Sequence, residues 1–76
     1  MEEPFMSMWV VYSDPKDFPG KYVARRHDLY HGREAAASDE HYVADTLEEI
    51  RAAIPGDLVC FARLPDDDVK IVETWL

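Results

Sequence analysis

The stretch TLEEIRAAIPGDLVCFA, residues 46–62, decides the fold, because it combines a bounded helix with an apolar strand. Thr46 and Glu49 form a capping-box pattern, in which a hydroxyl and a carboxylate satisfy the free amides at a helix start. The apolar residues recur at the spacing of one helix face and are Leu47, Ile50 and Ile54. Proline and glycine at 55–56 end the helix. The stretch therefore predicts one short helix followed by a strand over 58–62.

Three further segments have the β-branched and aromatic character of strands, and they are residues 8–12, 21–30 and 69–75. Pro19 and Gly20 separate the first two and fit a type II turn. Residues 31–45 are expected to be mostly loop, and a helix that starts earlier, near Asp39, is the alternative because Val43 extends the apolar stripe. The expected fold class is α+β, with a four-stranded antiparallel sheet, the element order β-β-α-β-β and one helix on one face.

The distribution of charge predicts the order of the strands in the sheet. The strands over 8–12 and 58–62 are apolar at nearly every position, as central strands are. Charged residues occur in the other two strands, as is usual at sheet edges, and they include Lys21, Arg25, Asp28, Lys70 and Glu73. Numbered along the chain, the predicted order in space is 2-1-3-4, with the helix crossing over the first strand.

One short helix covers one face of such a sheet, and the second face needs another cover. Trp9 and Val11 would lie on one face, and their neighbours in the first strand on the opposite one. Either residues 31–45 fold across the uncovered face or a second molecule does, since large apolar patches are rarely left in water. We expect a homodimer through the helix-free face, with Trp9 and Val11 or their opposite-facing neighbours in the contact. Arg25 and Glu73 are the candidate rim charges.

Length and composition predict a single domain over residues 1–76, with residues 1–7 as a flexible end. The chain is 47% hydrophobic and 12% aromatic, which is typical of a folded protein. The single cysteine, Cys60, cannot form an internal disulfide. The first residues are acidic where a signal peptide would be basic, and no apolar run is long enough to span a bilayer. These features predict a cytoplasmic protein.

The formal net charge is −8, and most of it lies in the second half of the chain: residues 1–34 carry five basic and six acidic side chains, residues 35–76 three and ten. Nucleic-acid binding usually requires the opposite balance. The charge therefore argues against nucleic acid and anionic membranes as partners. A protein that mimics nucleic acid through residues 39–49 and 66–68, and so inhibits a basic partner, is a second alternative function.

A basic segment stands out in this acidic chain. Arg25 and His27 share one face of the expected second strand, and Arg26 lies on the other. Arginine binds carboxylates and phosphates through forked hydrogen bonds. An anion- or metabolite-binding domain that uses Arg25, Arg26 and His27, with Lys21 and Arg33 nearby, is the first alternative function. The competing interpretation pairs these arginines with acidic residues of the second half, including Glu73.

Metal binding and catalysis find little support in the sequence. His27, His31, His41 and Cys60 come from separate segments and lack the spacing of a zinc site. Three adjacent aspartates at 66–68 lack the ligand spacing of a calcium loop. Cys60 lies among apolar neighbours, where a thiolate is disfavoured. We predict no enzyme activity, no metal and no cofactor.

The chain resembles small uncharacterised bacterial proteins of similar length in the segments 22–26 (YVARR), 45–51 (DTLEEIR), 67–68 (DD) and 71–76 (IVETWL). The resemblance covers nearly the whole chain. It implies a bacterial, cytoplasmic source and carries no assigned activity or functional residue. The leading hypothesis from the sequence is therefore a non-enzymatic interaction module or accessory module that associates with itself.

Overall fold

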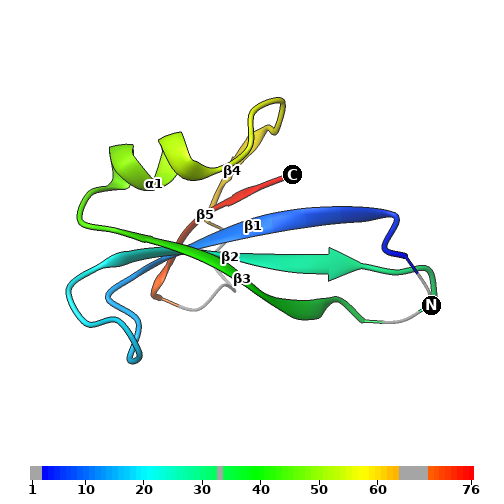
Figure 1. Cartoon of the computed structure of the whole chain (residues 1–76), viewed down its shortest axis with the longest axis horizontal. Helices are drawn as coiled ribbons and strands as arrows, with labels where there is room; N and C mark the ends of the chain where they lie inside the picture. The colour runs from blue at the N-terminus through cyan, green and yellow to red at the C-terminus, as the bar shows by residue number, and fades with distance from the viewer. Residues whose placement is uncertain (1–2, 33, 64–68) are drawn as a thin grey trace.

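The computed structural model describes residues 3–32, 34–63 and 69–76. Those ranges contain β1 (Met6–Ser13), β2 (Tyr22–Leu29), β3 (Ala36–Ala44), α1 (Leu47–Ala53), β4 (Cys60–Ala62) and β5 (Ile71–Trp75). All five strands form one antiparallel sheet in the order β3-β2-β1-β5-β4. Figure 1 shows α1 on one face of this twisted sheet, and no helix of the described ranges lies on the other. The expected α+β antiparallel class is confirmed.

Some expectations concern residues that the structure does not describe. The loop over 64–68, including the three aspartates, lies outside the described ranges, as does Arg33 of the basic segment. Met6 and Ser7, which were assigned to a flexible end over residues 1–7, belong to β1. The backbone amide of Phe5 donates to the carbonyl of Leu29 at 2.9 Å and continues the ladder with β2.

The helix forms where the sequence predicts it. Thr46 is the N-cap, and its side chain accepts a hydrogen bond from the backbone amide of Glu49 at 3.2 Å. Ile50 is fully buried and Ile54 nearly so. Both pack against β1 and β2 in a core that also contains Trp9, Val11 and Ala24. The apolar stripe of the helix therefore covers the face of the sheet to which Trp9 and Val11 point.

The predicted strand order is wrong in its second half. β5 lies next to β1, and β4, which was expected to be central, forms the edge. Phe61 of β4 is 50% exposed, whereas Glu73 of β5 is only 4% exposed. Glu73 does not mark an edge, because Arg51 of α1 and the Trp75 indole satisfy its carboxylate inside the fold. The ion pair with Arg51 therefore lets β5 carry a buried glutamate although β5 lies between β1 and β4.

Most of the segment expected to be loop forms an additional strand, β3, which pairs with β2 along its length. The sheet therefore has five strands instead of four, and the element order is β-β-β-α-β-β. The pairing is interrupted by a bulge opposite Arg25 and His27. β3 is an edge strand with most of its residues exposed, so it lacks the apolar alternation that marks a half-buried strand. This segment extends the sheet and does not fold across its helix-free face.

The β1–β2 connection covers one end of the helix-free face. The amide of Lys21 donates to the carbonyl of Phe18 at 3.2 Å, and Gly20 has a φ of +74°, as the predicted turn requires. The ring of Phe18 lies 5.5 Å from that of His41 on β3. Val23, which pairs with Tyr12 on this face, is fully buried. The rest of the helix-free face has no such cover among the described residues.

Candidate functional site

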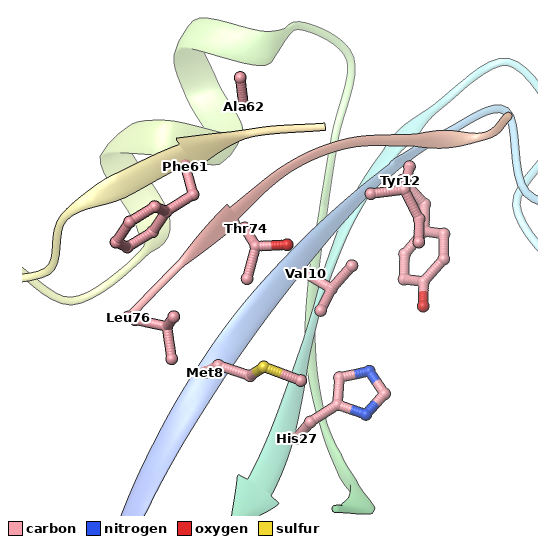
Figure 2. Close-up of a pocket in the computed structure, with 9 residues that line it drawn as sticks. Met8, Val10, Tyr12, His27, Phe61, Ala62, Thr74 and Leu76 are labelled. Atoms are coloured by element: carbon pink, nitrogen blue, oxygen red, sulfur yellow. The ribbon is translucent and has the colours of Figure 1, made fainter. Parts of the chain in front are cut away.

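An apolar groove of about 720 Å³ occupies the uncovered part of the helix-free face (Figure 2). Strands β1, β2, β4 and β5 form its walls, and residues from both halves of the chain meet in it. The described residues that line it are Met8, Val10, Tyr12, His27, Phe61, Ala62, Ile71, Thr74 and Leu76.

The register of the sheet brings these residues together. Val10 pairs with Thr74 of β5, and Met8 pairs with His27 of β2. Side chains directly opposite each other in an antiparallel pair lie on the same face, so each pair contributes two neighbouring groups. Phe61 pairs with Thr74 across β4 and β5 and extends the groove to the edge of the sheet. The alternation in β1 predicts which residues share a face, but not which face the helix leaves uncovered.

The described residues contribute no charged side chain to the groove, although the chain has a net charge of −8. None of its nine described lining residues is an aspartate, glutamate, lysine or arginine. Tyr12 and His27 carry the two ionisable side chains among them. A surface of this composition favours contact with an apolar surface, because the removal of apolar area from water is the main driving force of association.

His27 is the most polar group of the groove. Its Nε2 atom is buried and has no hydrogen-bond partner. Burial lowers the pKa of His27, and the charge of Arg25 lowers it further, while Asp28 acts weakly in the opposite direction. The imidazole is therefore held neutral at pH values where a solvated histidine begins to gain a proton.

The structure does not bring the basic residues 25–27 into one site. Arg25 lies on the face of His27 and pairs with Asp17 of the β1–β2 connection. Arg26 lies on the opposite face, where its Nε is 3.0 Å from Asp28 Oδ1 and its guanidinium also pairs with Glu40. Carboxylates of the chain thus already occupy both arginines. The predicted pairing partner Glu73 is instead bound to Arg51.

The same ion pairs lower the pKa of the carboxyl groups involved. A hydrogen bond from Arg25 holds the pKa of Asp17 below its usual value. For Asp28 the largest cause is the hydrogen bond from the Ser7 hydroxyl, at 2.8 Å, and Arg26 adds to it. Asp45, in the segment considered as a nucleic-acid mimic, pairs with Lys21. Several of the acidic groups are therefore neutralised locally.

Trp9, Val11 and Glu73, the predicted interface residues, are buried under the helix. The carboxylate of Glu73 accepts hydrogen bonds from Arg51 at 2.7 and 3.0 Å and from the Trp75 indole at 2.7 Å. The hydrogen bonds from Arg51 are the main reason why the pKa of Glu73 is lowered. On the opposite face of β1, Met8 and Tyr12 are partly exposed and Val10 is buried, and all three line the groove.

Within the described ranges no three histidine, cysteine or acidic side chains come together in a way that could hold a metal ion. His31 lies beyond the end of β2, where it stacks on Phe5 with ring centroids 4.4 Å apart, and it does not line the groove with His27. Cys60 is exposed on the edge strand, and the pKa of its thiol is raised, first by partial desolvation and then by Glu73. No helix of the described ranges is long and apolar enough to cross a membrane.

Comparison of the chain with protein-family models, curated proteins and solved structures found no match. Its function is therefore inferred from the geometry of the groove and from the charge around it.

Proposed function

We propose that this chain is a self-associating interaction module, a homodimer whose two copies meet through the apolar groove. The observation that carries this proposal is the uncovered groove itself, which β1, β2, β4 and β5 build from apolar side chains. A two-fold interface requires one surface that is complementary to itself, and an apolar, uncharged face meets this requirement.

The chain exposes more area than a compact monomer of its mass, which leaves surface for a partner to cover. Its accessible surface is 5326 Å². A compact monomer of 8.8 kDa is expected to expose about 4,800 Å². The difference of about 500 Å² approaches the roughly 800 Å² that each partner contributes to a standard interface. The radius of gyration, 12.4 Å, likewise exceeds the value of about 11.4 Å expected for a compact chain of this length.

Electrostatics restricts which surfaces of two copies can meet. Each copy has a net charge of −8, so contacts between carboxylate-bearing surfaces would repel. The groove is free of such groups. Arg25 and Asp17, which lie on the same side of the sheet, pair within one copy and leave little charge at the rim. Association through the groove therefore costs little electrostatic energy compared with other faces.

The anion-binding alternative has less support than association. It requires arginines that are free to bind a ligand, whereas Arg25 and Arg26 are paired with Asp17, Asp28 and Glu40. An anion would have to displace these carboxylates, and the overall negative charge of the chain opposes its approach.

Two matched aromatic substitutions test the proposal. Phe61 and Phe5 have similar exposure, 50% and 52%, but Phe61 lines the groove and Phe5 does not. We expect Phe61→Asp to convert a dimer of twice 8.8 kDa into a monomer, while Phe5→Asp leaves the dimer intact. Light scattering on a size-exclusion column measures both masses. A wild-type monomer, or equal effects of the two substitutions, would contradict the proposal.

A further inference from the structure

The imidazole of His27 introduces a titratable group into the surface that two copies are proposed to share. Its Nε2 is buried at the groove wall without a hydrogen-bond partner. Figure 2 shows the ring beside Met8, among the apolar side chains of the groove. A second copy seated on the groove would remove the remaining water from this ring.

The carboxylate on the face of His27, that of Asp17, is already paired with Arg25 and is not free to stabilise a positive charge on the imidazole. Across the β1 and β3 ladders it faces Met8 and Ala37, neither of which titrates. Arg25 lies two residues away on the same face and disfavours the imidazolium. Asp28 is the favourable charge, but it lies on the opposite face, bound to Ser7 and Arg26. Other titratable side chains on this face are Tyr12 of β1 and His41, which pairs with Arg25 in the β3 ladder, and the groove residues of β4 and β5 have uncharged side chains.

We infer that protonation of His27 drives the two copies apart, so that self-association through the groove depends on pH. This inference rests on the proposed function. Closing the groove makes the charged imidazole costlier than it is in the free monomer, because desolvation disfavours the charged form. The dimer therefore binds fewer protons than two monomers, and association strengthens as pH rises through the pKa of His27.

The size of the effect follows from the number of histidines that titrate. Each dimer contains two copies of His27, and each must lose its proton before the groove closes. At one pH unit below the pKa of His27 in the monomer, the dissociation constant should be about 120-fold higher than at high pH, about 11-fold for each copy. The pKa itself is measurable by NMR titration of the ring in a Phe61→Asn variant, which disrupts the apolar contact without adding a charge to the groove.

The test is the dissociation constant of the dimer, measured by sedimentation over a dilution series between about pH 8 and about pH 5. We expect the wild type to weaken steeply on acidification and His27→Gln to show a flat profile. His27→Leu provides a second neutral variant in case glutamine perturbs the strand. His31→Gln is the matched control, since His31 stacks on Phe5 outside the groove and its loss should leave the pH dependence unchanged.

The outcomes separate this inference from the proposed function. A wild-type dimer whose dissociation constant does not change with pH would overturn the role of His27 and leave the homodimer standing. If both His27 variants keep the pH dependence, the role of His27 is likewise overturned and the homodimer still stands. A chain that is monomeric at every pH would overturn both.

Discussion

Replacement of Glu73 by glutamine removes the one buried carboxylate of the described core while keeping its shape. Hydrogen bonds to charged groups contribute about 1.5–3 kcal/mol each. Three such bonds reach Glu73, two from Arg51 and one from Trp75. The glutamine oxygen can still accept from the indole, and the half-exposed Arg51 regains water. We therefore expect Glu73→Gln to lower the free energy of unfolding by about 2 kcal/mol, less than the roughly 3–5 kcal/mol of a fully buried ion pair, because only Glu73 is buried.

The measurement is urea unfolding followed by circular dichroism in the monomeric Phe61→Asp background, so that association does not contribute. For a domain of this size, about 2 kcal/mol corresponds to a fall in Tm of roughly 8–16 °C. Glu34→Gln is the control, because Glu34 is exposed and lies outside the helix and strands. An unchanged or higher stability of Glu73→Gln would refute the reasoning that this ion pair supports β5 in the centre of the sheet.

The stability difference between the parent and Glu73→Gln should also depend on pH. The folded-state pKa of Glu73 lies below the usual 4.5, so its stabilising effect is fully present above that value and is lost as pH falls through the lowered pKa. The difference in stability between the parent and Glu73→Gln should therefore shrink below about pH 4.5. A difference that stays constant down to pH 2 would show that the carboxylate charge is not its source.

Two further substitutions test local features of the fold. Thr46→Ala removes the N-cap acceptor of α1 and should lower the free energy of unfolding by about 1 kcal/mol, with Thr46→Ser close to wild type in the same thermal melts. Gly20→Ala places a side chain at a φ of +74° with nothing within 4 Å of its Cβ, so a loss of about 1 kcal/mol would come from the backbone alone. Equal stability of alanine and serine at position 46, or of alanine and glycine at position 20, would contradict these assignments.

The helix and the first hairpin are predictable because their signals are local. Thr46, Ile50 and the proline-glycine pair at 55–56 each specify a nearby conformation, and the structure has it. The position of β5 is not predictable in this way. Glu73 looks like an edge charge until Arg51, 22 residues earlier in the chain, is known to lie above it. The ion pair with Arg51 allows a charged residue to lie in a non-edge strand, so the charge in β5 does not indicate an edge.

The strand β3 and the location of the groove are two further features that the sequence does not predict. Edge strands with both faces exposed carry no burial pattern, and β3 also contains Asp39 and Glu40 at its bulge. The alternation of β1 does predict that Met8, Val10 and Tyr12 share a face. It does not predict which face α1 covers, because Trp9 and Val11 are equally apolar. The packing of Ile50 decides this, and with it the location of the candidate site.

The most direct test of the central claim is an isotope-filtered NMR experiment on a mixture of labelled and unlabelled chains, which detects only contacts between two copies. Association through the groove predicts intermolecular contacts from the methyl groups of Met8, Ile71 and Leu76, which line the groove and are partly exposed. Intermolecular contacts confined to the β3 edge or to the helix side would contradict it, as would the absence of any such contact at concentrations where the groove is well folded.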